Sequence, residues 1–419
     1  MARTLVVQLA RIGDLAQSRR LLSGLARRGE VHLAVDRSLT ALAARLYPFA
    51  VVHGLPAHGA PGQGPLAAAE RIRAARPVFE ALSATACDKV FTLNFSPLGM
   101  AVAALFPPEV QRGYRQFSGQ TDKDAVLRLV FRLARDRRGA GLNLADIWAH
   151  LDDDPLPPGE VNPPAAPRGG GLGVALAGRA ARRSLPPEVL APLVRTAFLA
   201  MGAKRVTLFG TAAQAGEARA LLRRLDGPVR EACVDATGQT DLPGLVEALS
   251  GLDRLLTPDT GAMHLAAFAG VPVTAFFLSS AWSHETGPYG EGHTVWQHTV
   301  PCAPCLESAP CDKGLLCLPP FADPAFLRCL AAPARAAPPA GLVGLSTGCD
   351  ALGAVCRPFC GQDPTRARRL ALRAFLTRRL AGDAADGVDA ALGHDLAESL
   401  SLETDWVLPP PGRTLSGEW

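Results

Sequence analysis

One stretch near the middle of the chain constrains the fold more than any other, because it places two apolar segments around a polar, glycine-containing turn. Residues 253–257 predict a short strand, residues 265–269 predict a helix that Gly270 ends, and residues 271–277 predict the next buried strand. The turn between the first strand and the helix consists of Pro258, Asp259, Thr260, Gly261, Ala262, Met263 and His264. A strand, a turn and a helix in this order are typical of an α/β protein with a parallel sheet.

This turn predicts a binding site for an anion. Unpaired N–H groups and the positive end of the helix dipole point out of a helix N-terminus, so the position favours a phosphate or a carboxylate. Gly261 lets such a group approach the backbone, while Asp259 and Thr260 supply side-chain oxygens that either cap the helix or bind sugar hydroxyls. His264 lies one turn further along, where it either contacts the bound group or packs inside the domain.

The same alternation of strands and helices occurs on both sides of a Pro- and Gly-rich stretch at residues 155–171. Before it, we expect a helix at residues 14–28 and strands at residues 4–9, 31–35, 49–52 and 89–93. After it, we expect strands at residues 172–176 and 205–209 and helices at residues 186–201 and 212–225. Neither half has the G-x-G-x-x-G pattern after its first strand, which disfavours a dinucleotide-dependent dehydrogenase.

We therefore predict an α/β protein with two Rossmann-like domains that face a cleft, followed by a Cys-rich extension. Ligands of such sheets bind at the carboxyl ends of the strands. The predicted boundaries are residues 1–160 for the first domain, 171–300 for the second, and 301–419 for the Cys-rich extension with its helical tail.

Composition agrees with an ordinary globular protein. The 419 residues exceed what a single hydrophobic core holds, and 48% of them are hydrophobic while 20% are charged. No apolar run reaches the length of a membrane span, and the apolar start of the chain is too short for a signal peptide, so we expect a cytoplasmic protein.

The net charge of +4 is mild, but basic residues gather in the first half of the chain. They form either solvated helix faces or a surface that meets phosphorylated lipid or a membrane. No nucleic-acid recognition motif accompanies them, so nucleic acid is not an expected partner. The clusters are Arg19 with Arg20, Arg27 with Arg28, Arg112 with Arg115, and residues 132–138.

Eight of the ten cysteines lie between Cys302 and Cys360. The first four, Cys302, Cys305, Cys311 and Cys317, begin with a C-x-x-C pair, which is typical of metal sites. Disulfides are disfavoured in a cytoplasmic protein, and four thiolates would select a structural zinc ion or an iron–sulfur cluster. The alternative is that these cysteines are small buried residues or redox-labile thiols.

Six short motifs between residues 3 and 300 follow one another in an order that is typical of one protein family. They are residues 5–14 with an R-x-G-D turn, residues 177–186, residues 207–210, the G-x-T-x-L turn at 238–242, the D-T-G-x-x-H turn at 259–264, and residues 286–290. In this order they resemble glycosyltransferase family 9, the heptosyltransferases, which share the two-domain GT-B fold and move a heptose from an ADP-sugar onto the growing lipopolysaccharide core.

The resemblance implies a role for each matching position. Transfer with inversion needs a base for the acceptor hydroxyl, and Asp14 matches the family's base; the alternative is that Asp14 only caps a helix. The leaving diphosphate needs donors and positive charge. The implied donor-binding residues are Gly178, Arg182, Arg183, Asp259, Thr260, Gly261, Met263 and His264.

Two positions depart from the family pattern. Arg182 or Arg183 stands where the family has a lysine, and Leu185 stands where it has a tryptophan, which puts the packing of donor or acceptor in doubt. The resemblance implies that transfer requires no cofactor, because the helix dipole and basic side chains replace a cation.

The resemblance further implies an ADP-sugar as donor and a phosphorylated, lipid-linked oligosaccharide as acceptor. It implies that the first domain, residues 1–160, binds the acceptor and that the second, residues 171–300, binds the nucleotide sugar. The enzyme would work in the cytoplasm, with peripheral contact to the inner membrane. Two alternatives stay open, a nucleotide-sugar epimerase with the same fold and a non-catalytic relative that binds a nucleotide sugar. The R-x-G-D turn disfavours the first of these, and the presence of Asp14, Asp259 and His264 disfavours the second.

Overall fold

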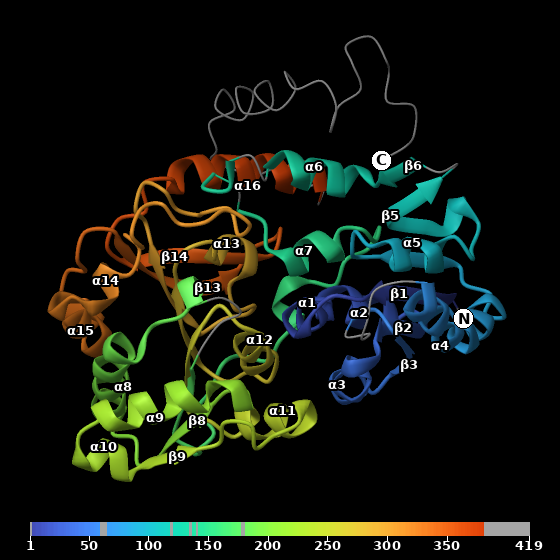
Figure 1. Ribbon diagram of the computed structural model, residues 1–419. Coiled ribbons are helices and arrows are strands. Elements are labelled where there is room, and N and C mark those ends of the chain that lie inside the picture. Colours follow the sequence, from blue (N-terminus) through green and yellow to red (C-terminus); the bar gives the residue numbers. More distant parts are fainter. Residues whose placement is uncertain are drawn as a thin grey trace. The chain divides into compact units, whose positions relative to one another are not determined.

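The computed structural model of the chain describes residues 2–58, 65–117, 120–133, 136–139, 141–176 and 181–380 (Figure 1). This part of the chain forms two compact units. Unit 1 comprises the described residues of 2–136 and of 144–156, and unit 2 comprises those of 137–143 and of 157–380. No helix among the described residues is long and apolar enough to span a membrane.

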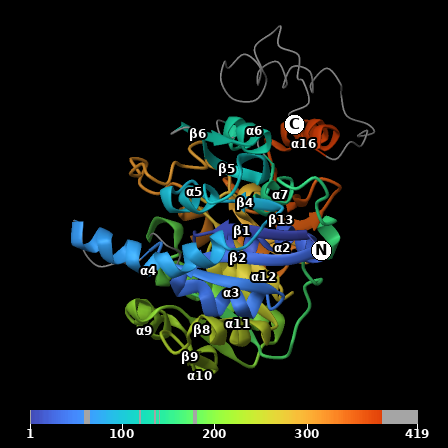
Figure 2. The same ribbon diagram turned by 90° about the vertical axis from the view of Figure 1, so that its right-hand side faces the viewer.

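Unit 1 is built on a six-stranded sheet in the order β3-β2-β1-β4-β5-β6. Its strands are β1 (Ala2–Gln8), β2 (Gly29–Asp36), β3 (Ala50–Leu55), β4 (Lys89–Thr92), β5 (Gln111–Phe117) and β6 (Gln120–Lys123). All pairs are parallel except β5 with β6. Figure 2 shows β5, β4, β1 and β2 following one another across the sheet.

The helices of unit 1 pack on this sheet and supply its core. They are α1 (Ile12–Gln17), α2 (Arg19–Ala26), α3 (Thr40–Leu46), α4 (Pro65–Ser83), α5 (Pro97–Ala103), α6 (Ala125–Leu133) and α7 (Leu144–Ala149). Leu5, Val7 and Val90 are fully buried on the central strands, as parallel strands covered on both faces require. Arg20 and Asp146 form a buried ion pair of 2.6 Å that ties α2 to α7.

Unit 2 is built on an eight-stranded sheet in the order β14-β13-β12-β11-β10-β7-β8-β9. Its strands are β7 (Leu172–Ala175), β8 (Val206–Phe209), β9 (Cys233–Asp235), β10 (Arg254–Pro258), β11 (Val273–Phe277), β12 (Thr294–His298), β13 (Leu342–Cys349) and β14 (Ala354–Cys360). The strands from β12 to β9 are parallel, and β13 and β14 add antiparallel pairs at one edge.

The helices of unit 2 follow the parallel strands and then cover the far end of the sheet. They are α8 (Pro187–Met201), α9 (Ala215–Arg224), α10 (Gly227–Glu231), α11 (Leu242–Ser250), α12 (Gly261–Phe268), α13 (Ser283–Thr286), α14 (Pro319–Ala322), α15 (Pro324–Ala331) and α16 (Arg366–Leu380). Trp296 of β12 is buried against Phe326 of α15, with ring centroids 4.9 Å apart.

In each sheet, the order in which the chain adds strands reverses between two neighbouring parallel strands. In unit 1 the chain builds outward from β1 on one side and from β4 on the other, and in unit 2 it does so from β7 and β10. The helices that follow two such strands lie on opposite faces, so a crevice opens at the carboxyl ends of the strands, where ligands bind in this class of fold. The turn after β10 occupies this position in unit 2, and the turn after β1 occupies it in unit 1.

The predicted α/β fold with two sheets of mainly parallel strands is confirmed, but two local features differ from expectation. The helix predicted over residues 14–28 is divided at Ser18, whose hydroxyl donates back to the carbonyl of Asp14 at 2.9 Å, an interaction that bends helices. The described part of the Cys-rich extension lies in unit 2, and β13 and β14 continue its sheet. The division into residues 1–160, 171–300 and 301–419 stays a prediction.

Candidate functional site

The turn after β10 has the local structure that its sequence predicts. α12 begins at Gly261, and the hydroxyl of Thr260 caps it by accepting from the backbone N–H of Met263 at 3.3 Å. Thr257 holds this cap, because its hydroxyl lies 2.9 Å from that of Thr260. Thr260 therefore takes the capping role that was open to both polar residues, which leaves the carboxylate of Asp259 for another partner.

Asp259 forms a buried polar cluster with two residues from other elements. Arg183, at the end of the 3-10 helix η5 (Ala181–Arg183), donates from Nη2 to Oδ2 of Asp259 at 2.5 Å. Thr286, the last residue of α13, donates its hydroxyl to the same oxygen at 3.2 Å. Only 7% of Asp259 is exposed. Burial raises its pKa to about 6, against the opposing effect of Arg183 and Thr286.

His264 lies beside this cluster without a direct bond to the carboxylate. Its Nε2 is 3.8 Å from Oδ1 of Asp259, which is beyond hydrogen-bonding distance. Burial, together with the charge of Arg183, lowers the pKa of His264 to about 4, so the imidazole is neutral at pH 7. Met263 is completely buried, and the backbone at Gly261 is only half-buried.

The two neighbouring arginines have different partners. Arg183 lies at the turn itself: its Nη2 also reaches the carbonyl of Asp259 at 3.4 Å, and its Nη1 lies 3.4 Å from Glu307. Arg182 instead donates to backbone carbonyls of the loop that follows, including that of Leu306 at 3.0 Å. The structure thus brings Arg183, Asp259, His264 and the start of α12 together, whereas Arg182 holds a loop. Gly178 lies outside the described residues.

Sequence reasoning missed two members of this cluster, Thr286 and Glu307. Thr286 belongs to one of the family-like segments, but its contact with Asp259 depends on how α13 folds back after β11. Glu307 stands in the cysteine-rich stretch, and its charge, although weaker than the other influences, adds to the raised pKa of Asp259.

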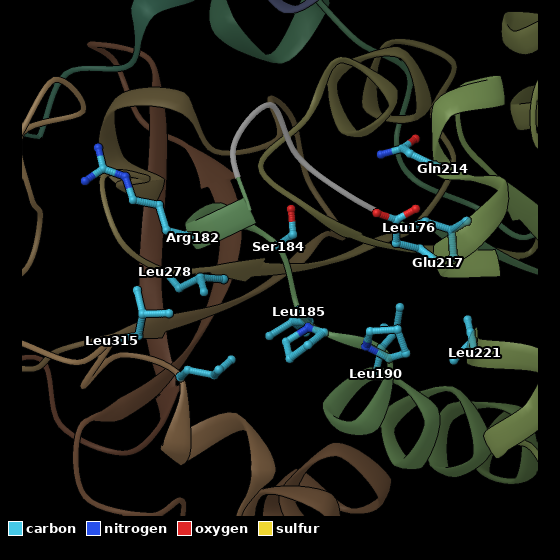
Figure 3. Close-up of a pocket in the computed structure, with 13 residues that line it drawn as sticks. Leu176, Arg182, Ser184, Leu185, Leu190, Gln214, Glu217, Leu221, Leu278 and Leu315 are labelled. Atoms are coloured by element: carbon cyan, nitrogen blue, oxygen red, sulfur yellow. The ribbon is translucent and has the colours of Figure 1, made fainter. Parts of the chain in front are cut away.

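A cavity of about 610 Å³ opens next to Arg182 in unit 2 (Figure 3). Leucine side chains dominate its lining, and Gln214 and Glu217 of the α9 region lie across it from Arg182 and Leu315. Leu185 also lines it, at the position where the family-like pattern has tryptophan. A smaller side chain at this position leaves room of the size that a small-molecule ligand fills.

Asp14 lies in unit 1, in the first turn of α1 after β1. Its carboxylate accepts from the backbone N–H of Arg11 at 3.2 Å, and its side chain is half-buried. Burial raises the pKa of Asp14, and the hydrogen bond from Arg11 opposes this effect. The arrangement stabilises the start of α1 and leaves the carboxylate more basic than an exposed one, so the capping role and the role as base are compatible.

The four cysteines predicted to bind a metal lie in the loop that follows β12. Among the described residues, which include all ten cysteines, no group of three or more His, Cys, Asp or Glu side chains is placed to hold a metal ion. Arginines hold this loop: Arg137 donates to the carbonyl of Cys305 at 2.9 Å, and Arg182 donates to those of the residues that follow. The set of Cys302, Cys305, Cys311 and Cys317 as ligands of a structural zinc ion or of an iron–sulfur cluster stays a prediction.

The fold and the site together define an α/β protein with two Rossmann-like sheets and a buried arginine–aspartate pair at an anion-binding turn. Residues 196–314 match the family model of glycosyltransferase family 9 (heptosyltransferase). The matched stretch includes Asp259, His264 and Thr286, while Asp14 and Arg183 precede it. The sequence has no match among curated proteins.

Solved structures of heptosyltransferases and of a family 9 glycosyl transferase share the fold. The ADP-heptose lipopolysaccharide heptosyltransferase II of E. coli is 16% identical, with 70% of this chain and 89% of that one covered at a TM-score of 0.52. E. coli heptosyltransferase WaaC with ADP is 17% identical, with 71% and 93% covered at 0.51. The family 9 glycosyl transferase of Veillonella parvula is 15% identical, with 71% and 86% covered at 0.52. The predicted resemblance is confirmed, and it supports glycosyltransferase activity.

Proposed function

We propose that the protein is an inverting glycosyltransferase that moves a heptose or a related sugar from an ADP-sugar to an acceptor of the lipopolysaccharide-core type. The observation that carries this proposal is the cluster of Arg183, Asp259 and Thr286 at the N-terminus of α12. Two further findings support it: residues 196–314 match the family model, and one of the similar structures is a heptosyltransferase with ADP.

The donor diphosphate binds at the start of α12. The backbone amides of Gly261 and Ala262 open the helix, whereas that of Met263 donates to the capping hydroxyl of Thr260. With the helix dipole, the first two amides stabilise the negative charge that develops on the leaving group. Arg183 brings a guanidinium group to the same turn, where it also pairs with Asp259. The side chain of Arg183 is 14% exposed, so water screens its charge less than it would on an open surface.

The donor sugar is recognised by the groups around the diphosphate. At pH 7 the carboxylate of Asp259 is mostly ionised, because its pKa of about 6 lies below that pH, and it accepts hydrogen bonds from sugar hydroxyls. His264 is neutral and therefore acts as a hydrogen-bonding group rather than as a cation. The cavity beside Leu185 accommodates apolar parts of the bound molecules.

Asp14 is the general base that removes the proton from the acceptor hydroxyl. Its raised pKa makes the carboxylate a better proton acceptor than an exposed aspartate, and its bond to Arg11 orients it. The activated oxygen displaces the ADP in one step, which inverts the anomeric centre. The acceptor is a phosphorylated, lipid-linked oligosaccharide, so the enzyme works at the cytoplasmic face of the membrane through peripheral contact.

An Asp14→Asn variant tests this assignment. Asparagine keeps a side-chain oxygen that accepts from the N–H of Arg11, so α1 should form as before, while the proton acceptor is lost. We expect transfer to fall by about 100-fold or more, with the Kd for ADP, measured by calorimetry, unchanged. Transfer near the wild-type rate would remove Asp14 from the mechanism.

A further inference from the structure

Three aromatic rings form a cluster in unit 1 that the mechanism above does not use. The centroid of Phe95 lies 5.7 Å from that of Tyr114, which lies 6.4 Å from that of Phe131, and both pairs meet edge to face. Tyr114 is buried, but Phe95 is 62% exposed and Phe131 is 38% exposed. Phe95 therefore presents most of its ring to solvent, while Phe131 presents a smaller part. We call these three residues the aromatic platform.

The local fold fixes the aromatic platform in place. Tyr114 of β5 pairs directly with Lys123 of β6, and α6, which carries Phe131, begins two residues later. Figures 1 and 2 both show α6 beside β5 and β6. Phe95 lies in the short turn between β4 and α5, where Ser96 caps α5 by accepting from the N–H of Gly99 at 3.1 Å.

The aromatic platform is adjacent to the turn that carries Asp14. β1 and β4 are neighbouring parallel strands, and the chain runs on from their carboxyl ends into these two turns. The turns touch, because the backbone N–H of Leu9 donates to the side-chain oxygen of Asn94, the residue before Phe95, at 2.6 Å. The strand order of the sheet in unit 1 also reverses between β1 and β4, and ligands bind at the carboxyl ends of two such strands.

The charges around the aromatic platform favour a neutral polar partner over an anionic surface. Asp122 lies 2.8 Å from Arg115 and 2.5 Å from Arg128, and Asp124 lies 3.6 Å from Arg115, so two carboxylates offset the charges of the two arginines. The ammonium group of Lys123 lies 4.7 Å from the ring centre of Phe131. The exposed ring of Phe95 thus belongs to a surface with ion-paired, partly exposed donors and acceptors, and this surface is not strongly basic.

We propose that the aromatic platform binds a sugar ring of the acceptor saccharide and thereby presents its hydroxyl to Asp14. This inference rests on the proposed function and adds the side chains that hold the acceptor within the domain expected to bind it. The C–H face of a pyranose ring is apolar and slightly positive, which complements the negative face of an aromatic ring. The sugar hydroxyls, in turn, complement the ion-paired side chains of Arg115, Asp122 and Arg128.

A Phe95→Ala variant tests the proposal. Because Phe95 is exposed, the variant should fold, and its thermal midpoint checks this. The matched control is Phe49→Ala: Phe49 is 45% exposed in the same unit, but it immediately precedes β3 and so lies at the opposite edge of the sheet. A Phe95→Tyr variant keeps the ring and should behave like the wild type.

Binding is measured by saturation-transfer NMR and calorimetry with the phosphorylated oligosaccharide released from truncated lipopolysaccharide by deacylation. We expect Phe95→Ala to weaken saccharide binding by about tenfold, the loss that removal of one stacked aromatic ring typically causes. Phe49→Ala and Phe95→Tyr should leave binding unchanged. In transfer assays, Phe95→Ala should raise KM for the acceptor and leave KM for the donor unchanged.

The outcomes separate this proposal from the proposed function. If the wild type binds the saccharide through Phe95 but transfers no sugar, the aromatic platform stands and the transferase assignment falls. If transfer occurs and Phe95→Ala matches Phe49→Ala in saccharide affinity and acceptor KM, the aromatic platform is overturned. The aromatic platform is also overturned if the wild type binds no saccharide. A Phe95→Ala variant that loses binding only to anionic phospholipid vesicles would overturn it as well, because the partner would then be a membrane.

Discussion

The ion pair of Arg183 with Asp259 makes the stability of unit 2 depend on pH in a way that one substitution should expose. The pKa of Asp259 is about 6, against an ordinary value of 3.8. A folded-state pKa above the unfolded one means that folding favours the protonated carboxyl. Stability from this group is therefore full at low pH and is lost as the pH rises through about 6. The difference corresponds to about 3 kcal/mol.

An Arg183→Leu variant removes the cation that opposes this loss. The pKa of Asp259 should then rise above 6, so that the loss of stability continues toward pH 8. At pH 5 the carboxyl is protonated with or without Arg183, so the variant should cost little there. At pH 8 it should cost about 3 kcal/mol, in the range seen when one partner of a buried pair is removed.

Urea unfolding at pH 5 and pH 8, followed by circular dichroism, measures this difference. Two controls isolate the pair: Arg182→Leu, in which the lost arginine contacts backbone carbonyls, and the double variant Arg183→Leu/Asp259→Asn, which has no carboxylate to leave unpaired. Neither should show the extra loss at pH 8. Equal destabilisation by Arg183→Leu at both pH values would refute the argument.

Two further predictions follow from other contacts of the site. Thr286→Val removes the hydroxyl that donates to Asp259, so the pKa of Asp259 should rise. The acid limb of the kcat/KM profile should therefore move to higher pH, and the Kd for the ADP-sugar should increase by about tenfold. An unchanged pH profile would contradict a role for this contact. Incubation with a metal chelator should lower the urea midpoint, because Cys302, Cys305, Cys311 and Cys317 are predicted to hold a structural metal ion; an unchanged midpoint would contradict this.

The local pattern at residues 253–277 was enough to predict its structure. Its strands are rich in buried apolar residues and Gly270 ends its helix, so β10, α12 and β11 follow from short-range rules. The choice of Thr260 over Asp259 as the cap needed the structure. The family-like order of motifs then located Asp14 and Asp259. These features depend on neighbours along the chain, which a sequence displays directly.

The parts that could not be predicted depend on contacts between distant segments. The choice of Arg183 over Arg182 is decided by the loop that holds the carbonyl of Leu306, more than one hundred residues away. The contact of Thr286 with Asp259 and the cluster of Phe95 with Tyr114 likewise arise only once the sheets are assembled. The cysteine spacing predicts metal binding, but it does not display the contacts that Arg137 and Arg182 make with backbone carbonyls of the same loop.

The central claim is that the protein transfers a sugar with inversion from an ADP-sugar to a saccharide acceptor. The direct test is to incubate the wild-type protein with ADP- and UDP-sugars and deacylated, truncated lipopolysaccharide, and to analyse the product by mass spectrometry and NMR. We predict that the acceptor gains one sugar from an ADP-sugar and that the new linkage has the anomeric configuration opposite to that of the donor. An isomerised donor formed without acceptor, or an unchanged acceptor with every donor, would contradict the claim.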